Sequence, residues 1–182
     1  MQVGFTKPTS KANWVKPNIT KEIIMSKTLV AYFSRTGEQY SVGEITEGNT
    51  KKLAEVIADK TGGDLFEIKV AKDNYPNKYT PLIQYAKEEK QANARPEIVG
   101  KVDNMDEYDT VFIGYPNWWA DMPMPVYTFI ESYDLSSKKV YKFCTHEGSG
   151  GVHRDDFALY GHIAQNDKAQ TENKVEEWLK SL

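Results

Sequence analysis

Hydroxyl groups and a glycine gather where the first strongly apolar segment gives way to a helical pattern. Ser34, Thr36 and Thr50 carry hydroxyls, and Gly37 permits close backbone approach. With the free N–H groups at a helix start, these groups suit a dianionic phosphate. The alternative is structural, with Asn49 or Thr50 capping the helix and Gly37 making a turn. No Gly-Lys-Ser/Thr ending is present, so the loop is not a nucleotide P-loop.

Two adjacent tryptophans follow the second apolar segment, in residues 115–125 (YPNWWADMPMP), where prolines stiffen both flanks. Adjacent loop residues cannot both face the same core, so we expect at least one indole of Trp118 and Trp119 to be exposed or to cover a ligand. Flat aromatic surface beside a phosphate site suits a planar heterocycle. The alternative is that both rings fill the gap between sheet and helix.

A third loop, residues 145–151 (THEGSGG), follows a further apolar segment and is rich in glycine. Its backbone N–H groups can approach the polar edge of a ring, although a plain glycine-rich turn has the same composition. His146 and Glu147 are a candidate acid–base pair. Because neighbouring side chains often point apart, we expect them to contact a ring edge rather than to act in catalysis.

Strand-like segments precede all three loops. Residues 28–33 (TLVAYF) and 110–115 (TVFIGY) are short, nearly all-apolar runs, which are typical of strands buried on both faces. Residues 139–145 (KVYKFCT) predict a further strand, and residues 64–70 (DLFEIKV) alternate like a strand nearer a sheet edge. The carboxyl ends of parallel strands are where such sheets bind ligands, so the three loops are expected to meet there.

Helical patterns alternate with these strands, over residues 49–60, 81–94, 125–133 and 173–182. The alternation predicts an α/β fold with a doubly wound parallel sheet and three layers, α/β/α. Residues 157–164 (FALYGHIA) are the candidate last strand. Little room for a crossover helix precedes them, so the last βα unit is expected to be shortened.

The composition fits one domain of 182 residues, with net charge −3. Residues 1–25 are expected to be a tail or a start-site extension without a signal peptide, and residues 26–182 the folded domain. No segment approaches a membrane span and no basic cluster suits nucleic acid, so we expect neither membrane nor nucleic-acid binding. Cys144 is expected to be an inert buried thiol, and His153 and His162 surface or packing residues. One cysteine and three histidines suit neither a disulfide nor a Cys/His metal site, which favours a cytoplasmic protein.

The order of these motifs resembles the flavodoxin family, in the branch of short bacterial flavodoxins with a paired tryptophan. The resemblance rests on LVAYFSRTGE…EGNTKKLAEVIA and on YDTVFIGYPNWWADMPMPVYTFIESYDLSSKKVYKFCTHEGSG, across residues 27–151. Residues 172–182 are similar to the closing helix of the family. Beyond residue 151 the chain is shorter than the family pattern.

The resemblance implies FMN bound without covalent attachment. It places the FMN phosphate on Ser34, Arg35, Thr36, Gly37, Asn49 and Thr50. The isoalloxazine ring would lie between the second and third loops, with Trp118 or Trp119 stacked on it. The remaining ring-edge residues would be Pro116, Asn117, Thr145, His146, Glu147 and Gly148.

The expected function is electron transfer, in which FMN performs the redox chemistry and the protein sets its potential. We expect an electron carrier that docks transiently with redox partner proteins. The alternative is an FMN-dependent NAD(P)H:quinone reductase, in which NAD(P)H and a small acceptor share the site above the ring. A second alternative is a non-redox apo scaffold of the same fold. A phosphoacceptor receiver domain is excluded, because residues 32–34 (YFS) supply no acidic cluster for a divalent cation.

Overall fold

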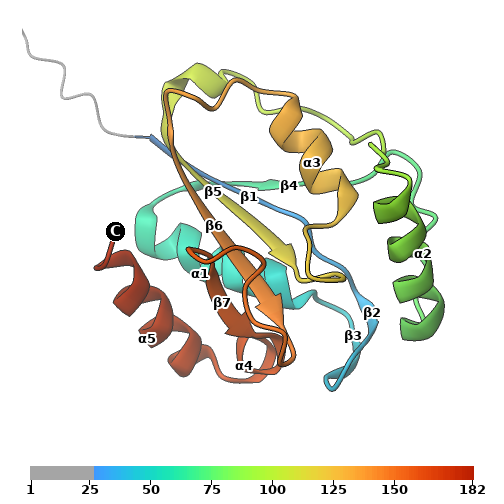
Figure 1. The fold of residues 1–182 in the computed structure, drawn as a ribbon. Helices are drawn as coiled ribbons and strands as arrows, with labels where there is room; N and C mark the ends of the chain where they lie inside the picture. The colour runs from blue at the N-terminus through green and yellow to red at the C-terminus, as the bar shows by residue number, and fades with distance from the viewer. Residues whose placement is uncertain (1–26) are drawn as a thin grey trace, which may run out of the picture.

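Five parallel strands form the central sheet of the computed structural model, which describes residues 27–182 (Figure 1). The strands lie in the order β4-β1-β5-β6-β7, and every neighbouring pair is parallel. The order and direction confirm the predicted doubly wound α/β sheet. The strands are β1 (Lys27–Tyr32), β4 (Asp64–Glu67), β5 (Tyr108–Pro116), β6 (Lys139–His146) and β7 (Phe157–Tyr160).

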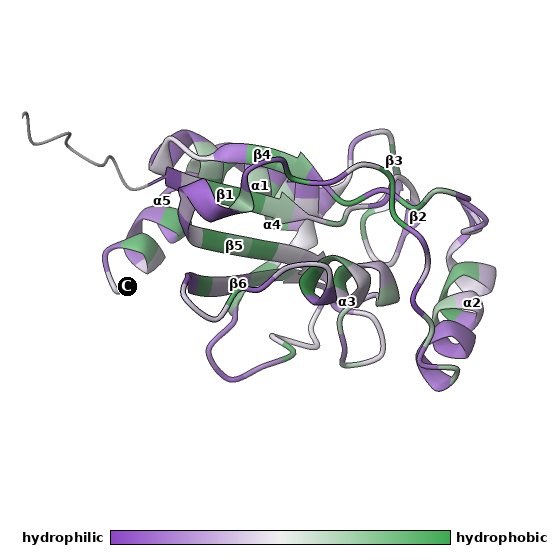
Figure 2. Ribbon diagram, turned by 90° about the horizontal axis from the view of Figure 1, so that it is seen from above, coloured by the Kyte–Doolittle hydropathy of each residue, from purple (hydrophilic) through white to green (hydrophobic). Residues whose placement is uncertain are grey.

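Alternate residues of the central strands enter two separate cores. On β1, Leu29 and Ala31 join one cluster, and Val30 and Tyr32 join the other. Both sets are buried because helices cover each face of the sheet, which is why the sequence shows an unbroken apolar run instead of alternation. Figure 2 shows hydrophobic colouring along β5, which lies between its neighbours β1 and β6.

Three helices cover one face of the sheet and one packs on the other. The first face carries α1 (Asn49–Thr61), α4 (Gly161–Asn166) and α5 (Lys168–Leu179), and the second carries α3 (Met124–Glu131) (Figure 1). The helix α2 (Tyr79–Gln91) lies beyond the strand ends and adds the buried Leu82 to the core on the α3 side (Figure 1). It therefore forms a side wall of the region where the three predicted loops meet.

A small antiparallel hairpin occupies the long excursion before α1, where the sequence suggested only a loop. Its strands are β2 (Gly37–Gln39) and β3 (Gly43–Ile45). The Glu38 carboxylate accepts a hydrogen bond from the Tyr79 N–H at the start of α2, at 3.0 Å. Because a helix start has unpaired N–H groups, this contact fastens α2 to the hairpin.

Two predicted strands end earlier than expected. The strand β4 ends at Glu67, the Ile68 N–H makes the last hydrogen bond to β1 at the Tyr32 carbonyl oxygen, and residues 69–71 pair with residues 97–99 instead. The expected strand 157–164 stops at Tyr160, and α4 follows it directly. A side chain from another segment supports this change, because Glu147 accepts a hydrogen bond from the His162 N–H in the first turn of α4.

The last helix begins earlier than expected, at Lys168 instead of Asn173. The Asp167 carboxylate caps it by accepting a hydrogen bond from the Gln170 N–H, at 2.9 Å. A short 3₁₀ helix, η1 (Met105–Glu107), precedes β5.

A loop without a helix connects β6 to β7, over residues 147–156. Val152 and Ala158 pack against the core on the α3 side of the sheet, where a crossover helix would otherwise lie. This confirms the expectation of a shortened last βα unit. No helix within residues 27–182 is long and apolar enough to cross a membrane, and the predicted tail, residues 1–25, lies outside the described residues.

Candidate functional site

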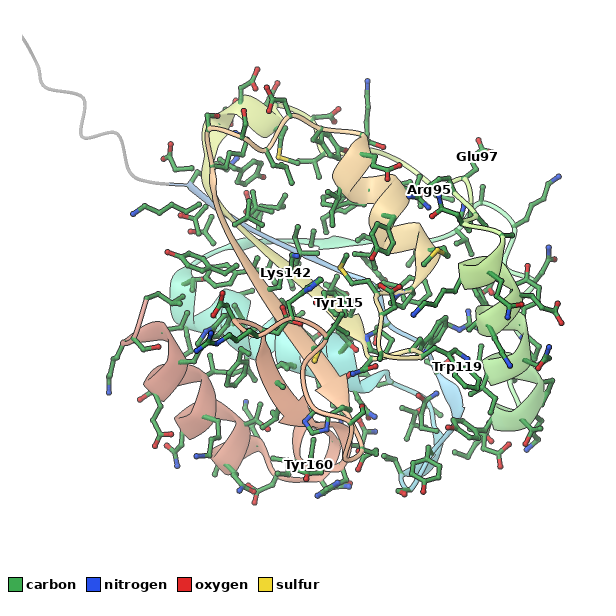
Figure 3. All side chains as sticks on the ribbon, viewed as in Figure 1. Arg95, Glu97, Tyr115, Trp119, Lys142 and Tyr160 are labelled. Atoms are coloured by element: carbon green, nitrogen blue, oxygen red, sulfur yellow. The ribbon has the colours of Figure 1, made fainter. Side chains whose placement is uncertain are left out.

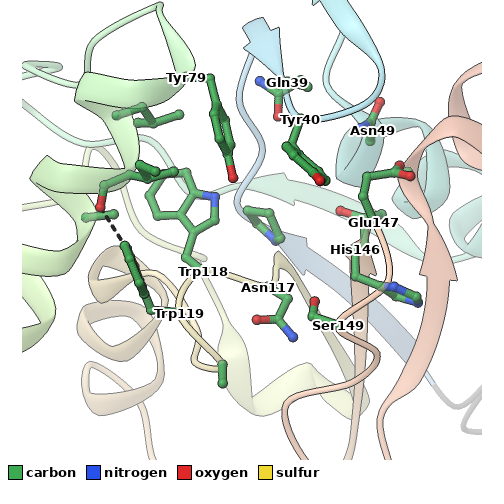
Figure 4. A pocket seen from close by; sticks show the side chains of 17 residues that line it. Gln39, Tyr40, Asn49, Tyr79, Asn117, Trp118, Trp119, His146, Glu147 and Ser149 are labelled. Carbon is green, nitrogen blue, oxygen red and sulfur yellow. Dashed lines mark hydrogen bonds between the residues drawn. The ribbon is translucent and has the colours of Figure 1, made fainter.

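A pocket of about 360 Å³ opens at the carboxyl ends of the central strands (Figure 4). Its volume lies within the usual range of small-molecule sites. One side consists of the hairpin and α2, and the other of the loops that follow β5 and β6. The residues around it are Gln39, Tyr40, Asn49, Tyr79, Leu82, Ile83, Ala86, Pro116, Asn117, Trp118, Trp119, Ala120, Thr145, His146, Glu147, Ser149 and Gly161.

The structure brings most of the predicted ring-contacting residues together in this pocket. They are Pro116, Asn117, Trp118, Trp119, Thr145, His146 and Glu147, with Asn49 of the predicted phosphate site beside them. Ser34, Arg35 and Thr36 instead border a separate small pocket of about 100 Å³. Gly37, Thr50 and Gly148 border neither pocket.

The start of α1 lies against the loop that follows β1. Its N-cap residue is Gly48, which supplies no side-chain cap, and its first turn contains no acidic residue. A Cβ atom at Gly48 would come within 2.1 Å of the Ser34 Oγ, so only glycine allows this approach. The Ser34 Oγ accepts a hydrogen bond from the Lys51 N–H. This bond uses the Lys51 donor, while the N–H groups of Asn49 and Thr50 make no hydrogen bond among the described residues and remain for an anion.

The side chain of Asn49 carries a buried hydrogen-bond acceptor that is unpaired among the described residues. Its Oδ1 atom is buried and has no partner among the described residues. Buried polar atoms are nearly always paired, so an unpaired one at a pocket wall indicates a missing partner. The orphan oxygen is an acceptor and fits a ligand that carries a donor such as a hydroxyl, whereas the close approach at Gly48 fits an anion at the helix start.

A buried hydroxyl pair joins α1 to the end of β6. The Thr50 Oγ1 and Thr145 Oγ1 atoms are 2.7 Å apart, and both side chains are buried. The Asn117 N–H also donates to the Thr145 carbonyl oxygen, at 2.9 Å. Thr145 therefore fixes the three predicted loops relative to one another.

Arg35 turns away from the helix start. Its guanidinium pairs with Asp73 and donates to the Tyr75 carbonyl oxygen, at 3.1 Å. The same group lies over the Tyr75 ring, 5.2 Å from its centroid. These contacts hold the segment before α2 and direct the Arg35 guanidinium toward Asp73 and Tyr75. A phosphate contact by this residue stays a prediction.

The two tryptophans have different environments. The Trp118 ring meets Phe33 edge-on, with centroids 5.5 Å apart, and also packs against Tyr75. Trp119 is 46% exposed, and its indole N–H donates to the Ile83 carbonyl oxygen at 2.7 Å (Figure 4). One indole therefore joins the core edge and the other lies at the pocket rim beside α2 (Figure 3).

The turn at Trp119 is strained. Trp119 and Ala120 have φ angles of +57° and +54°, in the left-handed region. Each such residue costs roughly 1 kcal/mol or more, so the surroundings must hold the turn. Lys90 does so by donating to the Trp119 carbonyl oxygen at 2.8 Å and pairing with Asp121 at 3.2 Å. Burial raises the pKa of Asp121, but hydrogen bonds from Tyr127, Met122 N–H and Lys90 outweigh it and lower that pKa overall.

The loop after β6 is held by one carboxylate. The Asp156 Oδ2 atom accepts hydrogen bonds from the Tyr115 hydroxyl at 2.8 Å and from the N–H groups of Val152 and His153. Burial and this hydrogen bond raise the pKa of Tyr115. At the near end of the loop, Gly148 has a φ angle of +110°, which other residues rarely adopt.

Charged groups border the third loop on its α4 side. The Glu147 carboxylate contacts His162 through both oxygens, with its Oε2 2.7 Å from the His162 Nδ1. The His146 Nδ1 accepts a hydrogen bond from the Gly148 N–H at 3.0 Å. Burial lowers the pKa of His146. His146 and Glu147 make no hydrogen bond with each other among the described residues, and Glu147 pairs with a histidine distant in sequence.

Several residues that border the pocket were not predicted from the sequence. Tyr40 comes from the hairpin and Tyr79 from the start of α2, and their ring centroids are 5.5 Å apart. Tyr40 is 57% exposed. The glycines at positions 37 and 43 were the available signal for the hairpin. No local pattern placed α2 at the pocket, because that depends on contacts between distant segments.

A family model described as Flavodoxin matches residues 27–181. Among solved structures, a candidate flavoprotein from Bacteroides eggerthii is 30% identical, covers 86% of this chain and 97% of its own, and superposes with a TM-score of 0.63. A candidate flavoprotein from Bacteroides uniformis is 28% identical, covers 85% and 98%, and has a TM-score of 0.64.

A third structure, a flavoprotein in complex with FMN from Lactobacillus acidophilus, is 24% identical. It covers 74% of this chain and 91% of its own, with a TM-score of 0.56. At that identity the similarity concerns the fold alone. No curated protein matches the chain.

Proposed function

The chain belongs to the flavodoxin family, and from that premise we propose that it binds FMN without a covalent bond and carries electrons between redox partner proteins. The observation that carries the proposal is a pocket that joins Asn49, the first residue of α1, to two loops with aromatic and polar side chains, next to a smaller pocket that Ser34, Thr36 and Gly48 border. FMN, when bound, supplies the redox chemistry through its isoalloxazine ring.

The start of α1 is the proposed phosphate site. The hydroxyls of Ser34 and Thr36 and the N–H groups of the first turn would hold the phosphate. This assignment is supported by the close approach at Gly48. The unpaired Asn49 Oδ1 is an acceptor and would instead receive a hydrogen bond from a ribityl hydroxyl of FMN. The positive end of the helix dipole favours an anion there.

The loops after β5 and β6 are the proposed ring site. Trp118 and Trp119 would supply the aromatic wall, and Asn117 and residues 145–148 the polar edge. The choice of FMN among flavins follows from membership of the flavodoxin family. The exposed rim at Tyr40 and Trp119 would leave a bound ring accessible to a partner protein, as a carrier requires.

One observation favours a second candidate, an FMN-dependent NAD(P)H:quinone reductase. Leu82, Ile83 and Ala86 of α2 extend the pocket with apolar surface beyond the two loops. A small planar acceptor would find room and apolar contact there. NADPH oxidation with a quinone, measured without any partner reductase, distinguishes the two functions, since rapid turnover would contradict a pure carrier.

The first test is FMN binding by the purified protein. We expect a yellow protein, or an apoprotein that quenches FMN fluorescence with one equivalent bound per chain. A reductive titration followed by visible absorbance should then show reversible reduction of the bound flavin. A colourless protein that takes up no FMN would contradict the proposal and leave the apo scaffold.

A further inference from the structure

The turn that contains Trp119 has a backbone form that its own residues disfavour. The Trp118 N–H donates to the Asp121 carbonyl oxygen at 3.0 Å, and the Asp121 N–H donates back to the Trp118 carbonyl oxygen at 3.1 Å. Between them, Trp119 and Ala120 both have positive φ angles, which is the mark of a type I′ turn. Such turns favour Asn-Gly or Asp-Gly. Because Trp-Ala lacks this preference, contacts from elsewhere in the chain must select the turn.

These contacts come from α2. The Lys90 Nζ atom donates to the Trp119 carbonyl oxygen at 2.8 Å and lies 3.2 Å from an Asp121 carboxylate oxygen, so one ammonium group bridges the middle and the end of the turn. The Trp119 indole N–H donates to the Ile83 carbonyl oxygen of the same helix. Lys90 itself does not border the pocket. It can therefore influence a bound ligand through the turn or through its charge, and an experiment can separate these two routes.

The turn sets the position of Trp118. Figure 4 shows the Trp118 indole at the pocket wall and Trp119 beside α2. The Trp118 ring packs against Phe33 and Tyr75, and both backbone hydrogen bonds of the turn fix its main chain. A type I turn, with negative φ at both central residues, twists the flanking chain in the opposite sense. The position of this indole in the pocket therefore depends on the form of the turn.

The carboxylate of Asp121 has anchors of its own. It accepts hydrogen bonds from the Met122 N–H at 2.8 Å and from the Tyr127 hydroxyl at 2.6 Å. Both contacts use the Oδ1 atom, whereas Lys90 lies next to the Oδ2 atom. Loss of the lysine would therefore leave Asp121 attached to α3 and release the Trp119 carbonyl oxygen. The form of the turn can thus be perturbed without detaching it from the helix that follows.

We propose that Lys90 is a positioning residue of the FMN site: by bridging the Trp119 carbonyl oxygen and the Asp121 carboxylate, it selects the left-handed turn that presents Trp118 to the ligand. The inference rests on the proposed FMN binding. Without the bridge, the turn relaxes in the apoprotein, and FMN binding has to re-form it. The apparent affinity for FMN then falls in proportion to the fraction of molecules that keep the competent turn.

The experiment introduces Lys90→Met into two backgrounds, the wild-type protein and the variant Trp119→Asn/Ala120→Gly, and measures FMN affinity by fluorescence quenching. Methionine is unbranched like lysine but donates no hydrogen bond and carries no charge. The Lys90 side chain is 37% exposed, so its replacement leaves no buried cavity. Asn-Gly is the sequence that type I′ turns favour most, so the second background forms the turn without the lysine.

In the wild-type background, Lys90→Met should weaken FMN binding about tenfold, which corresponds to about one apoprotein molecule in ten keeping the competent turn. In the Trp119→Asn/Ala120→Gly background the same substitution should change the affinity less than about twofold. Lys87→Met is the matched control, because Lys87 lies over the Trp119 ring and makes no hydrogen bond to the turn among the described residues. It should stay within about twofold of wild type.

The Trp118 and Asp121 amide protons give a second readout that needs no ligand, because they form the two backbone hydrogen bonds of the turn. Their hydrogen exchange in the apoprotein should be faster in Lys90→Met than in wild type. An equal loss of FMN affinity in both backgrounds would overturn the inference, because Lys90 would then act through its charge, and so would unchanged affinity or unchanged exchange. A wild-type protein that binds no FMN would instead contradict the proposed function.

Discussion

The Tyr115–Asp156 hydrogen bond gives the sharpest test of how the third loop is held. The Tyr115 ring is fully buried, and its hydroxyl is one of three donors to a single carboxylate oxygen. Tyr115→Phe removes one donor and leaves Asp156 with two backbone N–H groups. Since a hydrogen bond to a charged group contributes about 1.5–3 kcal/mol, we expect the free energy of unfolding to fall by about 2 kcal/mol.

Asp156→Ala should cost more, because it leaves the buried Tyr115 hydroxyl unpaired and releases the N–H groups of Val152 and His153. We expect a loss of about 3–4 kcal/mol, from about 2 kcal/mol for the stranded hydroxyl and about 1 kcal/mol for each backbone bond. Once Asp156 is absent, the Tyr115 hydroxyl has no partner to lose. Removing that hydroxyl then relieves the penalty of the stranded group, so the double variant should be about 2 kcal/mol more stable than Asp156→Ala alone, with a coupling energy of about 4 kcal/mol.

Urea unfolding of the apoprotein at equilibrium measures all four free energies. Tyr141→Phe is the matched control, since Tyr141 lies on β6 and its hydroxyl makes no hydrogen bond among the described residues; its stability should change by less than about 0.5 kcal/mol. FMN affinity, measured by fluorescence quenching, should fall in Asp156→Ala because this carboxylate holds the loop whose residues Glu147 and Ser149 border the pocket. Strict additivity of the two substitutions would refute the reasoning.

Four further predictions concern single residues. Thr36→Glu should weaken FMN binding at least about tenfold by repelling the phosphate while leaving urea stability unchanged, because Thr36 is exposed; unchanged affinity would contradict the phosphate site. Trp118→Ala should lower the free energy of unfolding by about 3 kcal/mol. Trp119→Ala, which loses an exposed ring, should lower it by only about 1 kcal/mol and mainly alter FMN affinity or potential. Equal urea midpoints for the two variants would contradict these different roles. Burial raises the pKa of Cys144 to about 12, so a thiol reagent should label it at neutral pH only after unfolding, and fast labelling of the native protein would disagree. Burial lowers the pKa of His146 in the folded protein. As the pH falls, the unfolded chain therefore protonates this residue before the folded protein does, and the free energy of unfolding should decrease below about pH 6.5. Urea unfolding between pH values of about 7.5 and 5 should show a smaller decrease for His146→Asn than for wild type.

The central elements were predictable because their local patterns agree with their final environments. The run at 28–33 is apolar on both faces, and helices do cover both faces of β1. The end of α1 was equally clear, since Gly62 adopts the left-handed conformation, with a φ angle of +65°, that closes a helix. The expected exposure of at least one indole is met by Trp119.

The remaining features depend on contacts between distant segments. The strands of the hairpin have three residues each, too few for a periodic pattern. An apolar run such as 157–164 does not distinguish a strand from a helix, and the side chain that supports α4 comes from Glu147. The pairing of Arg35 with Asp73 could not be predicted, because Asp73 belongs to a segment that only the fold brings close.

The lengths of the strands determine where another chain can attach. The outer strands, β4 and β7, have four residues each, whereas the inner strands β5 and β6 have nine and eight. Unpaired strand edges are the usual template for edge-to-edge aggregation, and short edges protect against it. The backbone N–H and C=O groups of the longest strands are thus paired with neighbouring strands on both sides. The protein should therefore resist fibril formation by strand addition even when it is stored at high concentration.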